Sequence, residues 1–293
     1  MPKRISHIER IAHAKVNLAL HVTGQREDGY HLLDSLVVFT EFGDGLSVSK
    51  SNNPSSLVSL KIDGPFSEGL DNGANNLVSR AALSLGYEIT KRSGKPTPVE
   101  IRLTKNLPIA SGIGGGSADA AATLLALKDF WQSDVDLMPI AQDLGADIPM
   151  CLHSTPLRAQ SIGDDIRLVE AKTPLHIVLV NPNIEVSTPS IFKQLTNKEN
   201  TPMYAKDITA MPLISEIKDL RNDLQNPAID LEPAIENVLS ALSQTNAQLE
   251  RMSGSGATCF GLYENHKEAQ TAANHIKSQN PTWWCVATTT TVS

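Results

Sequence analysis

Four glycines stand close together in the stretch PIASGIGGGSADAAATLLAL, which covers residues 108–127. They are Gly112, Gly114, Gly115 and Gly116, and a run typical of a helix follows them directly. Glycine lets another molecule approach the main chain closely, at a cost in conformational entropy. At a helix N-terminus, unpaired backbone N–H groups and the helix dipole favour an anion. The stretch therefore predicts a loop that binds phosphate through its main chain.

The spacing of these glycines excludes two familiar phosphate loops. A Walker A loop needs a lysine after its last glycine, whereas Ser117 follows Gly116. A dinucleotide fingerprint begun at Gly112 would need glycine in place of Ser117. The Ser117 hydroxyl can instead donate to a phosphate or contact a bound Mg²⁺. The alternative is a flexible turn that allows close helix packing, and a strand before the loop with a helix after it favours phosphate binding.

Two strands with alternating apolar and polar residues are expected before this loop. Residues 99–105 (VEIRLTK) alternate and lead into the glycine loop, which then enters a helix near Ser117. Residues 11–22 (IAHAKVNLALHV) also alternate, which puts Lys15 and Asn17 side by side on the face opposite the buried one.

Further turns, helices and strands are expected along the chain. Residues 35–42 and 46–50 predict a hairpin whose turn is Gly43, Asp44 and Gly45. A helix is expected from a cap at Asn76 to a stop at Gly86. The other expected helices are one over 136–144 ended by Gly145, one capped by Thr188, and two at 233–242 and 269–276. The other expected strands are a short one with Cys151 and His153, one over 175–180, one following residues 251–256, and one over 283–292.

Composition bounds the class of protein. A chain of 293 residues with 41% hydrophobic and 19% charged residues is long enough for two domains, which we expect at 1–160 and 161–293. The net charge of -7 argues against nucleic acid and anionic membranes as partners, so that small anions are the expected ligands. The lack of a long apolar stretch predicts a cytoplasmic protein. The cysteines, Cys151, Cys259 and Cys285, are predicted to be reduced thiols that build no metal site.

Three stretches resemble the motifs of the GHMP kinases, a superfamily of small-molecule kinases. The glycine stretch resembles their second motif, and residues 251–261 (RMSGSGATCFG) resemble the third. Residues 12–36 (AHAKVNLALHVTGQREDGYHLLDSL) are similar to the first motif of the branch that acts on a cytidine diphosphate-linked sugar alcohol. GADIP at 145–149 also fits, so that the resemblance spans most of the chain in the expected order.

The resemblance implies an α+β fold of two domains. The N-terminal domain would be similar to the second domain of ribosomal protein S5, and the C-terminal domain would be ferredoxin-like. The implied reaction transfers the γ-phosphoryl group of ATP, with Mg²⁺, to the 2-hydroxyl of 4-diphosphocytidyl-2-C-methyl-D-erythritol in non-mevalonate isoprenoid biosynthesis. No protein-held metal site is implied. The oligomeric state stays open between a monomer and a weak dimer.

The resemblance also implies roles for two charged residues. Asp147 in GADIP would accept the proton of the acceptor hydroxyl, and Lys15 beside it would hold the carboxylate ionised and orient the hydroxyl. Without the resemblance, the sequence favours a surface carboxylate at a helix end for Asp147 and an exposed strand residue for Lys15.

Binding residues follow from the same resemblance. Asn17 would hydrogen-bond the acceptor, Tyr30 would stack on cytosine, His31 would hydrogen-bond it, and Phe192 is a second stacking face or else a core residue. Gly254 and Ser255 would approach the acceptor or the phosphates, although a tight hairpin turn explains them too. The ATP-binding set is Asn76, which a helix cap also explains, with Pro108, Ile109, Ala110, Ser111, Gly112, Ile113, Gly114, Gly115, Gly116, Ser117 and Ala118.

The chain departs from the family pattern at three positions. His13 replaces a proline, Ser111 stands where glycine is common, and Ala118 replaces a second serine, which leaves Ser117 as the hydroxyl of the motif. Two alternatives remain at this point. One is another GHMP kinase of the homoserine or mevalonate-pathway type, against which the GYH triplet argues. The other is a non-catalytic nucleotide-binding module, against which the presence of both Lys15 and Asp147 argues.

Overall fold

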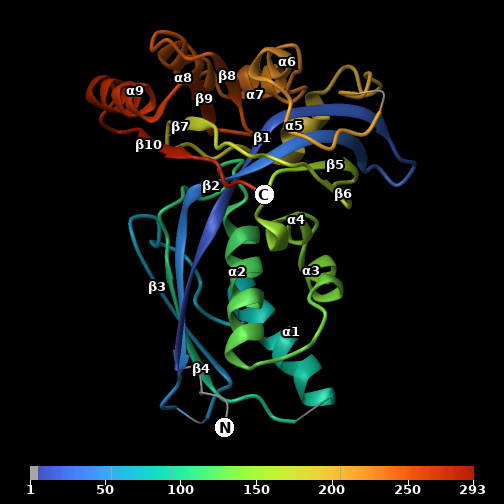
Figure 1. Ribbon diagram of the computed structural model, residues 1–293, viewed down its shortest axis with the longest axis vertical. Helices are drawn as coiled ribbons and strands as arrows, with labels where there is room; N and C mark the ends of the chain where they lie inside the picture. Colours follow the sequence, from blue (N-terminus) through green and yellow to red (C-terminus); the bar gives the residue numbers. More distant parts are fainter. Residues whose placement is uncertain (1–5, 54, 93, 205) are drawn as a thin grey trace. The chain divides into compact units, whose positions relative to one another are not determined.

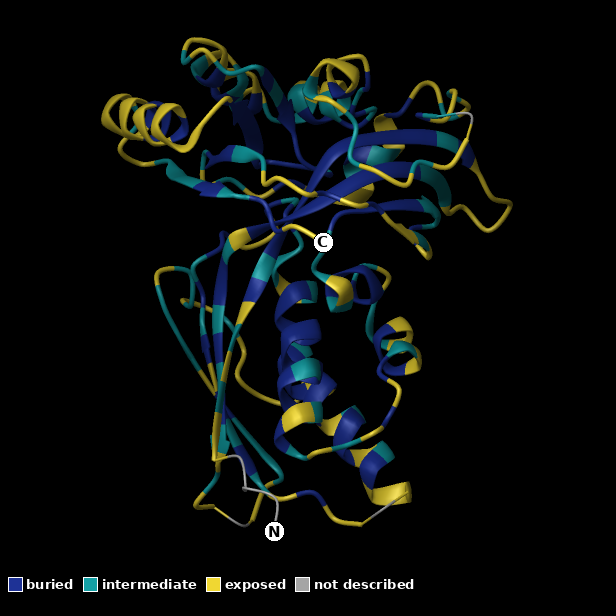
Figure 2. Cartoon of the chain, viewed as in Figure 1, coloured by how far each residue is buried: buried dark blue, intermediate teal, exposed yellow. Residues whose placement is uncertain are grey.

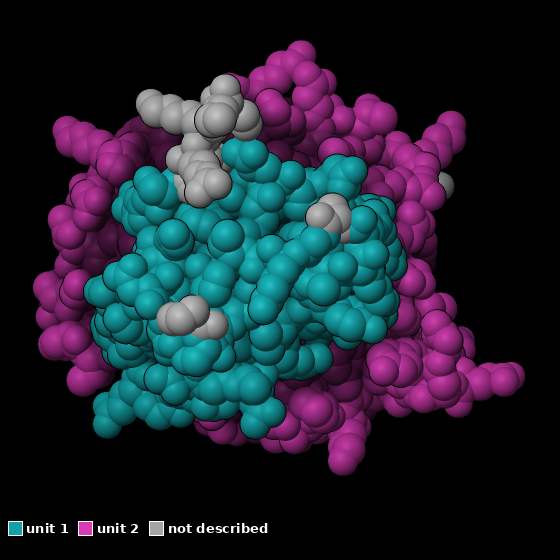
Figure 3. All heavy atoms as spheres, turned by 90° about the horizontal axis from the view of Figure 1, so that it is seen from below, with its two compact units in different colours: residues 1–14, 43–107, 115–153 teal, residues 15–42, 108–114, 154–293 magenta. Residues whose placement is uncertain are grey.

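The computed structural model describes residues 6–53, 55–92, 94–204 and 206–293, which form two compact units. Unit 1 comprises Met1–Ala14, Gly43–Leu107 and Gly115–His153; unit 2 comprises Lys15–Phe42, Pro108–Gly114 and Ser154–Ser293. Figure 3 distinguishes them by colour, and Figure 1 labels their helices and strands. The long strands β1 (His7–Gln25) and β2 (His31–Lys50) each run from one unit into the other. Because both units are discontinuous, the domain boundary at 160/161 stays a proposal.

Unit 1 combines strands with four packed helices. The end of β2 pairs antiparallel with β4 (Val99–Thr104), and β4 pairs parallel with β3 (Val58–Asp63). The helix α1 (Leu77–Arg92) makes the crossover between these two parallel strands, as a parallel pair requires. The helices α2 (Gly115–Phe130), α3 (Met138–Leu144) and α4 (Ile148–His153) follow; α2 and α3 pack against α1, and α4 packs against α2 and α3.

The predicted hairpin at Gly43 to Gly45 is wrong, because β2 runs straight through these residues. A Cβ atom on Gly43 would collide with the carbonyl oxygen of Ala12, so this glycine permits close approach of two strands instead of a turn. Asp44 is fully buried and forms an ion pair. The pattern of glycine, aspartate and glycine is that of a turn, but tertiary packing determines the structure.

Other predicted boundaries in unit 1 also need correction. Helix α1 does not stop at Gly86, which is buried in its middle, where a Cβ atom would lie 2.6 Å from Leu57 Cδ2. Cys151 and His153 belong to helix α4 and not to a short strand. By contrast, the helix cap at Asn76 is confirmed, because its Oδ1 accepts from the backbone N–H of Val78 at 2.9 Å.

Unit 2 contains a four-stranded antiparallel sheet with the order β10-β7-β9-β8. Its strands are β7 (His176–Asn181), β8 (Leu249–Met252), β9 (Cys259–Tyr263) and β10 (Trp284–Thr289), and its two main helices are α8 (Ala234–Ser243) and α9 (His266–Gln279). The chain order is strand, helix, strand, strand, helix, strand, which is the ferredoxin-like arrangement that the sequence predicts. The start of β2 adds an antiparallel group with β5 (Leu157–Ser161) and β6 (Asp165–Leu168).

The core of unit 2 lies between this sheet and its helices. Buried Ile235, Val238 and Leu242 of α8 recur at helical spacing, as predicted, and α9 contributes a second stripe. Figure 2 shows exposed residues on the outer side of α9 and buried ones along the strands. The short helices are α5 (Thr188–Gln194), α6 (Ile214–Lys218) and α7 (Gln225–Leu231). The N-cap of α5 is Ser187, so the predicted cap at Thr188 is wrong by one residue.

The composition of the chain bears on its cysteines and on the apolar character of its helices. The three cysteines are free thiols, two of them buried, as predicted. Burial raises the pKa of Cys285 to about 12 and also raises that of Cys259, which keeps both thiols protonated. Among the described residues, no helix has the length and apolar character needed to cross a membrane.

Candidate active site

The first half of the glycine loop, in unit 2, packs against the second glycine loop of the chain. Gly112 has a φ of 75°, and a Cβ atom there would lie 2.5 Å from the carbonyl oxygen of Ser253 and 2.7 Å from Gly256 N. Ser253 Oγ donates to the carbonyl oxygen of Gly112 at 3.1 Å, and Thr258 N donates to that of Ser111 at 3.1 Å. Glycine is thus required at position 112 for both its torsion and its contact. The second and third predicted motifs meet directly.

Lys15 lies on β1 against this loop. Its backbone N–H donates to the carbonyl oxygen of Ile113 at 2.9 Å. Gly114 has a φ of 67°, and a Cβ atom there would lie 3.2 Å from Lys15 Cβ and 3.3 Å from its Cε. The lysine is 7% exposed, so the alternative of an exposed strand residue is wrong. A buried ammonium group needs compensating partners, which is typical of a functional site.

Asn17 lies two residues further along β1 and is also buried, so ordinary polar exposure does not explain it. Its backbone N–H donates to Ser253 Oγ at 3.1 Å, and its Nδ2 donates to Ser35 Oγ at 2.7 Å. Its Oδ1 is buried without a hydrogen-bond partner among the described residues. Native proteins rarely leave a buried acceptor in this condition. This oxygen is therefore suited to accept a hydrogen bond from a ligand.

A ring pair stands at the start of β2. The rings of His31 and Phe192 stack with centroids 4.5 Å apart and an interplanar angle of 23°. Burial, followed by the charge of Lys198, lowers the pKa of His31 and favours its neutral form. Its Nε2 is buried and has no hydrogen-bond partner in the described part of the chain. Tyr30 beside it is 63% exposed, and an exposed aromatic ring next to a stacked pair is available to a planar ligand.

The third motif forms the turn between β8 and β9, as its hairpin interpretation predicts. Gly254 is buried, with a φ of 55°, and a Cβ atom there would lie 3.2 Å from Asn17 Oδ1. Ser255 Oγ and Thr188 Oγ1 are 2.7 Å apart and share a hydrogen bond. The turn also brings backbone atoms close to Asn17, so the structural and ligand-binding interpretations of these residues are compatible.

The second half of the glycine loop opens α2 in unit 1. The first four N–H groups of a helix lack partners within it, and those of α2 begin at Gly115. Gly116 is exposed, and a Cβ atom there would meet nothing within 4 Å. Ser117 is half-buried, whereas Ala118 points into the core. Of the remaining loop residues, Pro108 is buried, while Ile109 and Ala110 are exposed.

A buried ion cluster holds the two ends of this loop in unit 1. Lys105 Nζ lies 2.6 Å from Asp119 Oδ2 and also pairs with Asp44. Asp44 Oδ1 accepts from the backbone N–H groups of Asn106 at 2.6 Å and Leu107 at 2.8 Å. Lys105 precedes the loop and Asp119 follows it, so the cluster fixes the distance between the loop ends. Sequence reasoning missed it, since the three residues are far apart in the chain.

This cluster contains two buried carboxyl groups and one lysine. Burial raises the pKa of Asp119 to about 8, while Lys105 acts in the opposite direction and Asp44 adds to the rise. Burial would lower the pKa of Lys105, but the two carboxylates outweigh it and raise that pKa. Lys105 is therefore charged at neutral pH.

The remaining predicted residues lie apart from these loops in the chain. Asp147 is half-buried and directly precedes α4, whose Cys151 N–H donates to its carbonyl oxygen at 3.3 Å. Lys15 belongs to unit 2 and Asp147 to unit 1, and the predicted meeting of their side chains stays a prediction. Asn76 also lies in unit 1, and its cap accounts for its side chain without a ligand.

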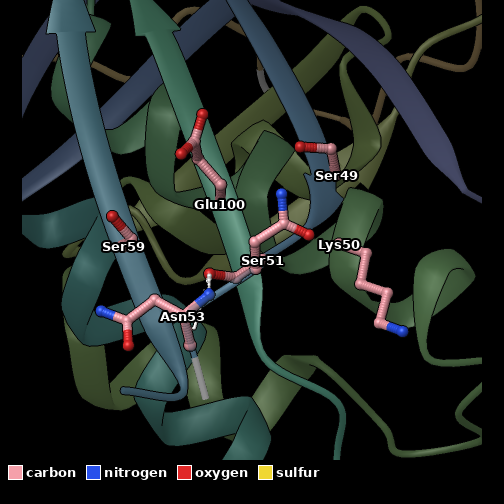
Figure 4. Close-up of a pocket in the computed structure, with 7 residues that line it drawn as sticks. Ser49, Lys50, Ser51, Asn53, Ser59 and Glu100 are labelled. Carbon is pink, nitrogen blue, oxygen red and sulfur yellow. Dashed lines mark hydrogen bonds between the residues drawn. The ribbon is translucent and has the colours of Figure 1, made fainter. Parts of the chain in front are cut away.

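Unit 1 also has a depression of about 530 Å³, which contains none of these residues. Polar side chains from β2, β3 and β4 line it, among them Lys50, Ser59 and Glu100 (Figure 4). Its shape and lining give no sign of a nucleotide site, which needs apolar walls and backbone donors. In the described part of the chain, no three His, Cys, Asp or Glu side chains are grouped to hold a metal ion.

Family models match both halves of the chain. The model for the N-terminal domain of GHMP kinases matches residues 76–155, and that for their C-terminal domain matches residues 208–282. The chain belongs to the GHMP kinases. It is therefore an ATP-dependent small-molecule kinase, as the sequence predicts, with the two-domain α+β fold of this family.

Individual GHMP kinases are similar along 95% of the chain. It is 46% identical to a 4-diphosphocytidyl-2-C-methyl-D-erythritol kinase of Sinorhizobium medicae, over 95% of this chain and 94% of that protein. It is 48% identical to the protein of the same name from Ruegeria pomeroyi, with 95% and 97% covered.

Solved structures agree with these relatives. A crystal structure of 4-(cytidine 5'-diphospho)-2C-methyl-D-erythritol kinase has a TM-score of 0.81 at 31% identity, with 98% of this chain and 100% of that chain covered. A homoserine kinase from Cytophaga hutchinsonii has a TM-score of 0.71 at 18% identity, with 100% and 96% covered, and shows the shared fold alone.

Proposed function

We propose that this GHMP kinase transfers the γ-phosphoryl group of ATP to the 2-hydroxyl of 4-diphosphocytidyl-2-C-methyl-D-erythritol, in non-mevalonate isoprenoid biosynthesis. The observation that carries the proposal is the similarity at 46–48% identity, over at least 94% of each chain, to kinases named for this acceptor. The homoserine and mevalonate kinases are similar at 18% and 14% identity.

The acceptor would bind to residues of unit 2. The stacked pair of His31 and Phe192, with exposed Tyr30 beside it, supports a site for the flat cytosine ring. The partnerless Nε2 of His31 would hydrogen-bond the base, and the partnerless Oδ1 of Asn17 would accept from an acceptor hydroxyl. Gly254 and Ser255 would border the acceptor from the neighbouring turn.

The phosphates of ATP would bind to main-chain N–H groups of residues 108–118. The N-terminus of the 16-residue helix α2 and the open space at Gly116 fit an anion there. Mg²⁺ would be held mostly by the nucleotide, with Ser117 as a protein contact, which agrees with the few ligands a protein commonly gives this ion. When bound, Mg²⁺ would neutralise phosphate charge.

The chemistry is an in-line phosphoryl transfer. The acceptor oxygen forms a bond to the γ-phosphorus, the bond from that phosphorus to the β,γ-bridging oxygen breaks, and ADP leaves with the electron pair. Asp147 accepts the hydroxyl proton, since a carboxylate can act as a base only while ionised. Lys15 favours that ionised form through its positive charge and orients the hydroxyl. These roles need the two side chains to meet in the working enzyme.

The test is acceptor-dependent release of ADP from Mg·ATP by the purified protein. We expect release with the cytidine-linked acceptor and none with homoserine or mevalonate. Tyr30→Ala would raise the KM for the cytidine compound and leave the KM for ATP unchanged. Release of ADP only with another acceptor would refute the proposed substrate. ATP binding without ADP release for any of the three acceptors would indicate a non-catalytic nucleotide-binding protein.

The cytoplasmic location and the oligomeric state, a monomer or a weak dimer, stay predictions.

A further inference from the structure

One segment of unit 2 joins β1 to the third motif. Residues 220–224 follow helix α6, and a parallel bridge connects Asn222 to Leu20 of β1. Leu20 N donates to the carbonyl oxygen of Arg221 at 2.9 Å, and Asp223 N donates to that of Leu20 at 2.9 Å. Val22 N donates to Asp223 Oδ2 at 2.7 Å. The segment is thus fixed to the strand that carries Lys15 and Asn17.

The side chain of Asn222 reaches from this segment to the third motif. Its Nδ2 donates to the carbonyl oxygens of Met252 and Gly254, each at 2.8 Å. Its Oδ1 accepts from Leu224 N at 3.0 Å. These partners settle the orientation of the amide, because the nitrogen faces two carbonyls and the oxygen faces an N–H group. The residue is 7% exposed, and both of its donors are used.

The carbonyls that Asn222 holds belong to the turn that borders the proposed acceptor site. A Cβ atom on Gly254 would lie 2.9 Å from the carbonyl oxygen of Gly112 and 3.2 Å from Asn17 Oδ1. Between them, Ser253 Oγ accepts from Asn17 N and donates to Gly112. A shift of this turn would therefore move the surroundings of Asn17 Oδ1, the acceptor atom that has no protein partner in the described residues.

A buried arginine supports the segment from β8. Arg251 Nη1 donates to the carbonyl oxygen of Leu18 at 2.6 Å, and its Nη2 donates to that of Leu220 at 2.6 Å. The guanidinium also donates to the main-chain carbonyl oxygens of Ile217 and Lys218. Burial lowers the pKa of Arg251 to about 10, which still leaves the guanidinium charged at neutral pH. The arginine and Asn222 thus connect β1, β8 and the segment in one network.

We propose that Asn222 is a positioning residue for the acceptor: its amide holds Met252 and Gly254 so that the turn keeps Asn17 in place for the acceptor hydroxyl. This inference rests on the proposed function. It assigns no contact between Asn222 and the acceptor. The effect reaches the acceptor through Gly254 and Asn17.

Asn222→Asp is the sharpest test, because it keeps the shape of the side chain and replaces both donors by an oxygen that repels two carbonyls. We expect the KM for 4-diphosphocytidyl-2-C-methyl-D-erythritol to rise about tenfold, with the KM for ATP changed less than about twofold. Asn183→Asp is the matched control. Asn183 is an exposed residue of unit 2 whose Nδ2 donates to the carbonyl oxygen of Thr282, and both KM values should stay as in the wild type.

The outcomes separate this inference from the proposed function. If the wild type releases no ADP with this acceptor, the proposed function fails. If the wild type is active and Asn222→Asp leaves the acceptor KM unchanged, or raises both KM values equally, Asn222 is not a positioning residue for the acceptor. Should Asn222→Asp fail to fold, Asn222→Ser is measured in the same way. It loses the amide donors without adding a charge, and the same split between the two KM values is required.

Discussion

Removing Lys105 should destabilise unit 1 strongly, because two buried carboxylates share this one side chain. The side chain of Lys105 is 6% exposed, that of Asp44 is 0% exposed and that of Asp119 is 5% exposed. Lys105→Met keeps the length of the aliphatic stem but removes the charge. Removing one partner of a buried ion pair costs about 3–5 kcal/mol. Because whole proteins are stable by about 5–15 kcal/mol, the variant should still fold with much reduced stability.

Two further variants separate the charge from the packing. In Lys105→Met with Asp119→Asn, Asp44 keeps the N–H groups of Asn106 and Leu107 while the second carboxylate is gone. We expect this double variant to be more stable than Lys105→Met by about 1 kcal/mol or more. Lys61→Met is the matched control, since its ion pair with Glu100 is exposed and should contribute less than about 1 kcal/mol.

The assay is urea unfolding followed by the fluorescence of Trp131, the tryptophan of unit 1, after Trp283 and Trp284 of unit 2 are replaced by phenylalanine in every variant. The free energies of unfolding then report on the unit that contains the cluster. A loss below about 1 kcal/mol in Lys105→Met would refute the reasoning. So would additive effects of the Lys105 and Asp119 changes, because a shared ion pair requires coupling between them.

Two more predictions concern unit 2 and the glycine loop. Gly112→Ala should lower the free energy of unfolding by about 2 kcal/mol or more, because it puts a Cβ atom at positive φ against Ser253. Gly116→Ala is the control, since its Cβ atom would meet open space and should cost no stability. Equal effects of the two changes in denaturant unfolding would contradict this prediction. Because burial lowers the pKa of His31, its stacking on Phe192 contributes stability that is present above about pH 6.5 and is lost as the pH falls below that value. The stability difference between the wild type and His31→Gln should therefore shrink from pH 7.5 to pH 5.5, and a constant difference would count against it.

The elements around the glycine loop could be predicted because their signals are local. The alternation of residues 99–105 and the helix-prone run after Ser117 are properties of adjacent residues, and strand β4 and helix α2 confirm them. The glycine, aspartate and glycine at 43–45 also gave a local signal, that of a turn. It was wrong because Gly43 packs against Ala12 and Asp44 pairs with Lys105, and neither partner is near in sequence.

The site itself could be predicted only in part, for the same physical reason. The resemblance to the GHMP kinases indicated Lys15 and Asn17, and their burial beside two glycine loops agrees with it. Asn222 gave no sequence signal, since its partner Met252 is thirty residues away and an asparagine before an aspartate is usual in loops. The buried charge of Arg251 was also hidden, because a strand pattern does not reveal which main-chain carbonyls lie nearby.

The central claim is that this kinase phosphorylates one hydroxyl of 4-diphosphocytidyl-2-C-methyl-D-erythritol with Asp147 as the base. The most direct measurement is mass spectrometry and ³¹P NMR of the product formed from Mg·ATP by the wild type and by Asp147→Asn. We expect one new phosphomonoester, on the 2-hydroxyl, from the wild type and at least about a hundredfold less from the variant. A phosphate on another position, or an equal yield from Asp147→Asn, would contradict the account.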